Sequence, residues 1–280
     1  MFHQRLHFRD IKRSMKSLIR ICFLICITTN VVLANELPKN ALQGSLIIGQ
    51  NSHIDEILMN GEPLKLSKDG DFVFAIGRDY KETISITSIK SGEILDIHQI
   101  KIIPQDYEIQ RIDGLPEQMV TPLDDEIIKR IISENNIIKE KKLLSLDETF
   151  FKNQFIQPTS GVISGVFGSQ RILNGKAKSP HRGLDIAADE GTPIYACNDG
   201  IVIHAENNLY YTGGTIILDH GHGVKSIYAH MSEVKVNVND KVTKDDVIGS
   251  VGSTGRSTGP HLHWGVMVFN EYVDPALLIK

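Results

Sequence analysis

Cysteine is scarce in this chain, with only three residues among 280. Cys22 and Cys26 lie within the first 34 residues, and removal of that segment would leave Cys197 alone. A lone thiol forms no internal disulfide bond, so we expect core burial or a bound metal to stabilise the fold.

The chain also lacks an excess of basic residues and an apolar run long enough to span a membrane comfortably. It has 30 Lys and Arg against 34 Asp and Glu, and without residues 1–34 the balance is 24 against 33. An acidic body disfavours nucleic acid as a partner, because phosphate contacts need a basic surface. With 41% hydrophobic and 23% charged residues, the composition excludes a disordered, collagen-like or multi-span membrane chain.

Residues 1–34 have the layout of an export signal. A basic stretch over residues 1–20 precedes the mostly apolar run 21–33, which ends at the small residue Ala34. Polar residues interrupt that run, which makes it too short for a membrane span of about 20 apolar residues. We therefore predict a signal peptide and a periplasmic or envelope-associated protein with no stable membrane span after cleavage. An uncleaved anchor is the alternative, and it would also place the body outside the cytoplasm.

The remaining residues divide into three segments of a mainly β protein. Residues 37–120 alternate short β-prone runs with turn signals such as Asn60-Gly61 and Ser91-Gly92, which predicts a small antiparallel β-sandwich as an accessory domain. Residues 122–150 carry isoleucines at helical spacing, with acids first and mainly lysines last, which predicts an amphipathic helical linker. Residues 155–280 return to short strands between glycine-rich turns, which predicts an antiparallel β domain.

Histidines in the last segment have the spacing of metal ligands. His181 precedes Asp185 by four residues, in a loop that we expect to lead into a strand. His261 and His263 would face the same way on another strand, because side chains alternate along a strand. Zinc takes imidazole nitrogen and carboxylate oxygen as ligands. Taken alone, each pattern is also compatible with hydrogen-bonded structural histidines, and so is His230 near the end of a β-like run.

The glycine-rich loop over residues 249–260 is not a phosphate-binding loop. It contains no Gly-Lys pair, and a strand rather than a helix is expected after it. Its glycines would let the backbone turn sharply and deliver His261 and His263. His220 and His222 lie in a predicted hairpin turn, and the sequence assigns them no role.

Three motifs together resemble the lysostaphin/LytM-like zinc endopeptidases, which cut peptide bonds in peptidoglycan. They are H-R-G-L-D at 181–185, H-G-H-G-V-K-S-I-Y-A-H at 220–230 and G-S-T-G-R-S-T-G-P-H-L-H-W at 252–264. The resemblance covers residues 155–280 and implies an antiparallel β fold with a groove over one zinc ion.

The resemblance also implies roles for five residues. His181, Asp185 and His263 would bind the zinc ion, and His230 and His261 would be catalytic residues that do not bind it. A zinc-activated water would attack the peptide bond. His261 would accept the proton of that water and His230 would stabilise the oxyanion, although the two roles could be exchanged.

We therefore predict an exported zinc metalloendopeptidase that hydrolyses peptide cross-links of peptidoglycan. The bond could be of the D,D or the glycyl type. The segment 110–116 resembles the accessory region of exported Gram-negative family members, which favours D-alanyl–diaminopimelate cross-links. One alternative is a regulator that binds the wall or activates another wall hydrolase without cutting. The sequence pattern of residues 199–203 and 238–247 also suggests a lipoyl- or biotinyl-like carrier domain. The export signal and the His-x-His strand disfavour this alternative. The oligomeric state, and any covering of the groove by residues 37–150 or 171–179, stay open.

Overall fold

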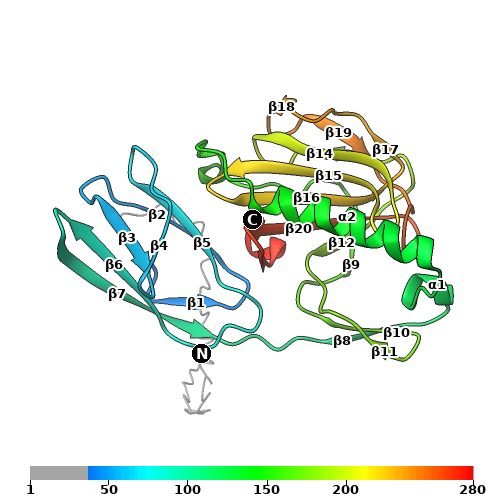
Figure 1. The fold of residues 1–280 in the computed structure, drawn as a ribbon, viewed down its shortest axis with the longest axis horizontal. Helices are drawn as coiled ribbons and strands as arrows, with labels where there is room; N and C mark the ends of the chain where they lie inside the picture. The colour runs from blue at the N-terminus through cyan, green and yellow to red at the C-terminus, as the bar shows by residue number, and fades with distance from the viewer. Residues whose placement is uncertain (1–36, 280) are drawn as a thin grey trace, which may run out of the picture.

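The computed structural model describes residues 37–279, which form two β-rich bodies joined by an extended segment and a long helix (Figure 1). The predicted export signal, residues 1–34, lies outside the described residues. Within the part that is described, no helix is long and apolar enough to cross a membrane. The prediction of a mainly β fold is confirmed, because strands outnumber helices throughout residues 37–279.

The N-terminal body consists of a five-stranded sheet and a two-stranded ribbon. The sheet has the order β1-β7-β6-β3-β4, and the ribbon pairs β2 with β5. Two of the predicted turns close hairpins: Asn60 and Gly61, like Ser91 and Gly92, have positive φ at both positions, as a type I′ turn requires. The strands are β1 (Asn40–Leu42), β2 (Leu46–Gln50), β3 (Glu56–Met59), β4 (Glu62–Pro63), β5 (Asp71–Ala75), β6 (Ile84–Lys90) and β7 (Glu93–Ile103).

The ribbon of β2 and β5 is shared by the two bodies. Both strands are buried along almost their whole length, because alternate side chains point to opposite faces. One face packs into the core of the N-terminal body and the other into the core of the C-terminal body. The residues of the first face are Ile47, Phe72 and Phe74, and those of the second are Leu46, Ile48 and Val73.

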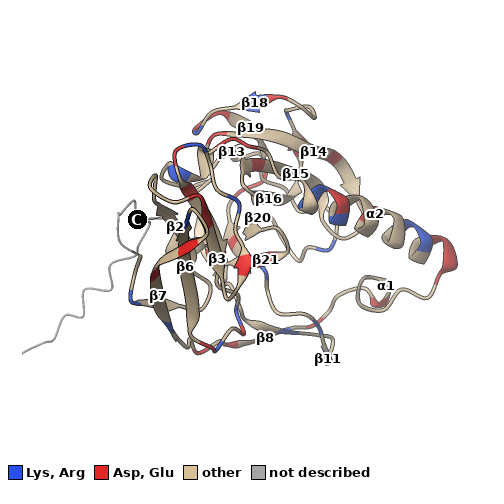
Figure 2. Cartoon of the chain, turned by 60° about the vertical axis from the view of Figure 1, so that its left-hand side comes forward, with Lys and Arg blue, Asp and Glu red and all other residues tan. Residues whose placement is uncertain are grey.

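The connection between the bodies contains strand β8 (Ile109–Ile112) and helices α1 (Glu117–Val120) and α2 (Asp125–Leu143). β8 pairs in parallel with β10 (Gln170–Leu173), so it adds to a small sheet of the C-terminal part. The Asp124 side chain caps α2 by accepting hydrogen bonds from two backbone N–H groups of the first turn. Helix α2, with both basic and acidic side chains along its length (Figure 2), lies against the large C-terminal sheet, where Ile138 packs on an apolar cluster.

The C-terminal body is built on one large antiparallel sheet with the order β18-β14-β15-β16-β20-β12-β9, and β21 pairs with β20. A three-stranded sheet, β13-β19-β17, packs over its inner face, and β8 pairs with the hairpin of β10 and β11. The elements are η1 (Phe150–Lys152), β9 (Val162–Gly165), β10 (Gln170–Leu173), β11 (Lys176–Ala177), β12 (Leu184–Ala187), β13 (Pro193–Tyr195), β14 (Gly200–Leu209), β15 (Gly213–Gly221), β16 (Val224–Met231), β17 (Glu233–Val234), β18 (Lys241–Val242), β19 (Val247–Ser250), β20 (His261–Val268), β21 (Glu271–Val273) and η2 (Pro275–Leu277).

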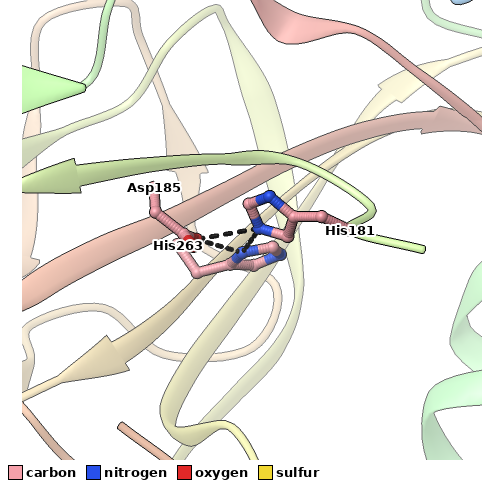
Figure 3. A group of neighbouring side chains, drawn as sticks. All are labelled: His181, Asp185 and His263. Atoms are coloured by element: carbon pink, nitrogen blue, oxygen red, sulfur yellow. Dashed lines mark hydrogen bonds and ion pairs between the residues drawn. The ribbon is translucent and has the colours of Figure 1, made fainter. Parts of the chain in front are cut away.

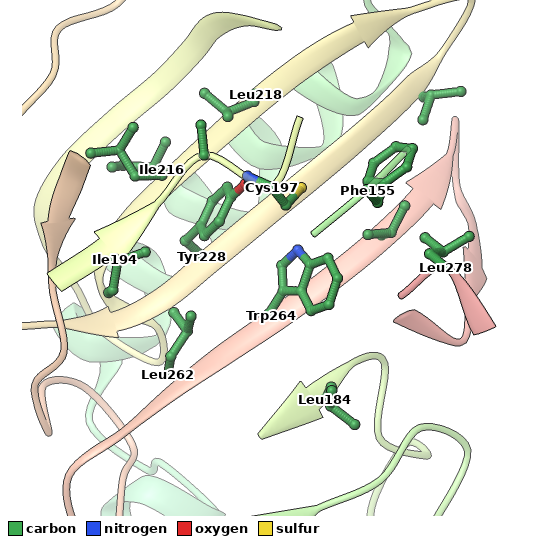
Figure 4. Close-up of a cluster of buried hydrophobic side chains, with 14 of the residues drawn as sticks. Phe155, Leu184, Ile194, Cys197, Ile216, Leu218, Tyr228, Leu262, Trp264 and Leu278 are labelled. Carbon is green, nitrogen blue, oxygen red and sulfur yellow. Dashed lines mark hydrogen bonds between the residues drawn. The ribbon is translucent and has the colours of Figure 1, made fainter. Parts of the chain in front are cut away.

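The core of the C-terminal body is largely apolar (Figure 4), but a chain of hydrogen bonds crosses it. The Cys197 N–H donates to the Tyr228 hydroxyl at 2.9 Å, and that hydroxyl lies 3.1 Å from Ser226 Oγ. Ser226 Oγ lies 2.8 Å from Nε2 of His220, whose Nδ1–H donates to the Asp199 carbonyl at 2.6 Å. His220 therefore holds one buried tautomer, with Nε2 as an acceptor.

We expect His220 to make the protein less stable in acid. Burial lowers the pKa of His220 to about 4, whereas an unfolded histidine has a pKa of about 6.5. The unfolded chain therefore takes up this proton first, and the free energy of unfolding falls as the pH drops from about 6.5 to about 4. Urea unfolding at several pH values should give a shallower dependence for His220→Gln. The exposed-site control His53→Gln should keep the wild-type slope, and an unchanged slope in both variants would contradict the assignment.

A buried cation attaches the end of α2 to the large sheet. Lys225 on β16 is completely buried, and its Nζ donates to the Leu144 carbonyl at 2.5 Å and to the Gly223 carbonyl at 3.3 Å. Its Nζ also lies 3.7 Å from Oδ2 of Asp219, which is equally buried. The C-terminal end of the helix is thus fixed by charge-assisted hydrogen bonding as well as by apolar packing.

Candidate metal centre

Strand pairing in the large sheet brings the predicted ligands together. β12 pairs with β20 so that Asp185 lies opposite His263. His181 lies on the loop just before β12, and this loop passes close to β20 because Gly183 has no side chain. A Cβ atom on Gly183 would lie 2.4 Å from the Trp264 carbonyl oxygen. Along β20, Leu262 and Trp264 point into the core while His261 and His263 point to the other side, as the period of two predicts.

Three side-chain atoms converge on one point (Figure 3). Oδ1 of Asp185 lies 2.9 Å from Nε2 of His181 and 2.8 Å from Nδ1 of His263, and the two nitrogens are 3.0 Å apart. Among residues 37–279 this is the group of histidine and acidic side chains whose donor atoms could hold a metal ion. His181 and Asp185 are buried, and the side chain of His263 is 16% exposed. A ligand could therefore reach the group from the side of His263.

Hydrogen bonding prepares His181 to bind a metal. Its Nδ1–H donates to the Val166 carbonyl at 2.9 Å, which leaves Nε2 as a lone pair directed at Asp185. Two acceptors then face each other at 2.9 Å, an arrangement that a cation between them would stabilise. Two imidazole nitrogens and one carboxylate oxygen are a donor set that zinc uses in proteins. The residues present therefore fit a zinc ion.

The electrostatics of the group favour the metal-binding protonation states. Burial alone would raise the pKa of Asp185, but the close contacts with the His181 and His263 imidazoles hold it well below its usual range. Burial lowers the pKa of His263, against the opposing effect of Asp185. At neutral pH the carboxylate is therefore charged and the His263 imidazole is neutral, as metal coordination requires.

The two other predicted histidines lie beside this group. The rings of His230 and His261 have centroids 4.7 Å apart, and the centroids of His230 and His263 are 6.2 Å apart. Nδ1–H of His230 donates to the Thr254 carbonyl at 2.8 Å, and Nδ1–H of His261 donates to the Gly259 carbonyl at 2.8 Å. Each ring therefore carries a free Nε2 lone pair in its neutral form.

His230 has two further unusual properties. It is the penultimate residue of β16 and lies in the left-handed region, with φ of 64°, which is uncommon for a residue other than glycine and often marks a functional site. Burial lowers the pKa of His230 to about 3, and the nearby imidazoles of His261 and His263 act in the same direction. His230 is therefore neutral over the whole physiological range of pH.

Arg171 is a contact of the group that the sequence did not indicate. It lies on β10, and its Nη2 donates to Oδ2 of Asp185, the oxygen that does not face the histidines. The guanidinium thereby holds the carboxylate with Oδ1 toward His181 and His263. An isolated arginine carries no motif, and its proximity to Asp185 depends on the small sheet of β8, β10 and β11. His220 and His222, to which the sequence assigns no role, lie elsewhere, packed against Phe155 and Phe151 respectively.

A divided cavity adjoins the group. One part, of about 460 Å³, lies beneath α2 and is lined by residues that include His181, His230 and His263. A second part, of about 250 Å³, lies between β8 and the loop over residues 256–260 and reaches Asp185 and His261. Arg171 and Arg256 line both parts. A polypeptide substrate lying across the group would therefore contact both arginines.

The region that contains the centre is similar to known peptidases. Residues 179–275 match Peptidase family M23. A peptidoglycan DD-endopeptidase of Vibrio cholerae, ShyA, is 40% identical over 99 residues, which are 35% of this chain and 23% of that protein. The DD-carboxypeptidase/endopeptidase Mpg of Neisseria meningitidis is 41% identical over 95 residues, which are 34% of this chain and 22% of that protein. The matched region thus spans about a quarter of the length of these relatives.

A solved structure extends the likeness to most of the chain. It is described as a candidate M23 peptidase from Pseudomonas aeruginosa, and it is 25% identical to this chain. The superposition has a TM-score of 0.65 and covers 85% of this chain and 94% of the other. Because the coverage exceeds the C-terminal body, the likeness includes the N-terminal body as well.

Proposed function

We propose that this chain, whose residues 179–275 match Peptidase family M23, is a zinc endopeptidase of that family that hydrolyses peptide cross-links of peptidoglycan. The observation that carries the proposal is the convergence of His181 Nε2, Asp185 Oδ1 and His263 Nδ1, with two further imidazoles beside them. The substrate class is supported by the relatives named as peptidoglycan DD-endopeptidases and as a DD-carboxypeptidase/endopeptidase. The proposed bonds are those in which D-alanine supplies the carbonyl group, as in D-alanyl–diaminopimelate cross-links.

His181, Asp185 and His263 would hold a single zinc ion. When bound, zinc supplies a Lewis acid that lowers the pKa of a coordinated water to about 7 and polarises a carbonyl oxygen. Arg171 keeps Asp185 in a fixed orientation through the oxygen that faces away from the histidines. Val166 fixes His181 in the tautomer that presents Nε2.

His261 is the proposed proton acceptor. The Gly259 carbonyl holds its Nδ1–H, so that Nε2 can take a proton from the attacking water and pass it to the leaving amine. His261 is less buried than His230, so its ring is the more accessible of the two to water and to the substrate. Neutral His230 offers an Nε2 acceptor that orients the water or a substrate N–H, and it could stabilise an oxyanion only after gaining a proton.

The proposal also assigns the protein a cellular location and each segment of the chain a role. Residues 1–34 would act as an export signal and place the protein in the periplasm or at the cell envelope. Residues 37–120 would form an accessory domain, residues 122–150 a helical linker, and residues 155–280 the catalytic domain. Peptidoglycan peptides lie outside the cytoplasm, which agrees with export.

Digestion of cross-linked muropeptides tests this function directly. The purified full chain loaded with zinc is expected to convert muropeptide dimers into monomers, identified by mass spectrometry. A chelator should stop the reaction and added zinc should restore it, because the ligands must be occupied for water activation. Failure to bind zinc, together with unchanged muropeptides, would instead support a regulator that binds the wall without cutting.

A further inference from the structure

The cavity beside the metal centre is strongly basic, although the chain as a whole has a net charge of −4. Apart from the ligand Asp185, the two parts of the cavity are lined by a single acidic side chain, Glu134. Five cationic side chains line the larger part: Lys142, Arg171, Lys178, Arg182 and Arg256. A concave site lined by one sign of charge concentrates ligands of the other sign.

Among the described residues, most of this charge has no acidic partner, although Lys178 Nζ donates to the Val120 carbonyl at 2.7 Å. Both oxygens of Glu134 are already engaged, one with Arg130 Nε at 2.6 Å and the other with the Tyr210 N–H at 2.8 Å. Arg171 is paired with Asp185. Within residues 37–279, the four other cations form no ion pair, and three of them lie over tyrosine rings. The basic charge of the cavity is therefore available to a ligand.

Arg256 is the cation best placed to meet a substrate at the reacting bond. It lines both parts of the cavity, together with His230. Its Cζ lies 4.5 Å from the centroid of the Tyr211 ring, and its Nη1 donates to the Met119 carbonyl at 3.2 Å. These contacts fix the plane of the guanidinium while leaving other N–H donors unused, because arginine has five. Burial lowers the pKa of Arg256, yet a guanidinium with a reference value above 12 stays charged at neutral pH.

We propose that Arg256 is a specificity-determining residue that binds a free carboxylate of the substrate peptide next to the bond that is cut. The proposal rests on the proposed function, since the ligand is the cross-linked peptide. A planar guanidinium donates two parallel hydrogen bonds to a carboxylate, and a neutral carboxamide cannot replace that pair. Stem peptides with free carboxylates are therefore the preferred substrates, and amidated ones are poor substrates.

The test compares two forms of one muropeptide dimer, with its free carboxylates intact or converted to carboxamides. Arg256→Gln should lower kcat/KM for the acid form about 10- to 100-fold, mainly through KM, because hydrogen bonds to charged groups are among the strong ones. It should leave kcat/KM for the carboxamide form nearly unchanged, and Arg256→Lys should recover part of the loss. Arg111→Gln is the matched control, because Arg111 is exposed on β8 and does not line the cavity.

Binding measured by calorimetry separates this inference from the proposed function. Zinc-free wild-type protein should bind the acid form more tightly than the carboxamide form, and Arg256→Gln should remove that difference. An equal loss on both substrates would assign Arg256 a structural role through Met119, and no loss on either would leave it without a role; each result overturns the inference. If the wild type cuts neither form but still prefers the acid form in binding, the proposed function fails and carboxylate recognition stands.

Discussion

The Asp185→Ala variant is expected to lose its bound zinc and to cut cross-linked muropeptides at least roughly 1,000-fold more slowly than the wild type. The carboxylate contributes one of three converging donor atoms and the only negative charge among them. Its removal leaves two neutral imidazoles, which hold a divalent ion far more weakly. It also removes the carboxylate that Arg171 binds, so an uncompensated guanidinium lies beside the site. Metal analysis of the purified variant and a muropeptide digestion measure the two effects separately.

His261→Ala is the matched control for this experiment. It removes an imidazole from the same cavity, but not one of the three converging donors. We expect this variant to keep one zinc ion per chain while its turnover falls about 100- to 10,000-fold, the range of general acid–base catalysis. Zinc retained at full occupancy in Asp185→Ala, or lost in His261→Ala, would reverse the roles assigned to these residues.

The Lys225→Met variant is expected to lower the free energy of unfolding by about 3–5 kcal/mol, the usual cost of removing one partner of a buried ion pair. Burial lowers the pKa of Lys225 and raises that of Asp219, against their mutual attraction. Without the ammonium group, the Asp219 carboxylate and the Leu144 carbonyl would both remain buried with no cation. Urea unfolding followed by circular dichroism measures the loss as a lower midpoint at an unchanged slope.

Two variants show whether the effect comes from burial. Lys235 pairs with Glu233 at 3.3 Å on the exposed surface, so Lys235→Met should cost no more than about 1 kcal/mol. The double variant Lys225→Met/Asp219→Leu removes both buried charges and should recover much of the stability. A Lys225→Met protein as stable as the wild type would mean that the ammonium group does not hold the end of α2.

Local patterns in the sequence predict much of the fold. The β-prone runs near residues 46, 71 and 84 become β2, β5 and β6, and the isoleucine-rich segment becomes α2. These predictions succeed because turn chemistry, strand alternation and helix capping depend on neighbouring residues. The shared ribbon of β2 and β5 and the parallel pairing of β8 with β10 could not be predicted, since both depend on contacts between residues far apart in the chain.

In the candidate site, too, the features set by local sequence could be predicted and those set by distant contacts could not. The structure brings the five predicted residues together, because the period of two along β20 fixes His261 and His263 on one side of the sheet. Their roles remain a prediction. The orienting groups escape sequence analysis: the carbonyls of Val166, Thr254 and Gly259 belong to the backbone, which carries no residue-specific signal. The arginines Arg171 and Arg256 escape it because single basic residues recur throughout the chain.

The ribbon of β2 and β5 has a consequence for how the molecule comes apart. Its alternate side chains pack into both cores. Neither body can therefore unfold without exposing apolar side chains in the core of the other. Heat or denaturant would therefore unfold both bodies in one cooperative transition rather than in two separate ones. A shortened chain that began after the N-terminal body would expose to water the apolar surface that the ribbon normally covers, and exposed apolar surfaces promote aggregation.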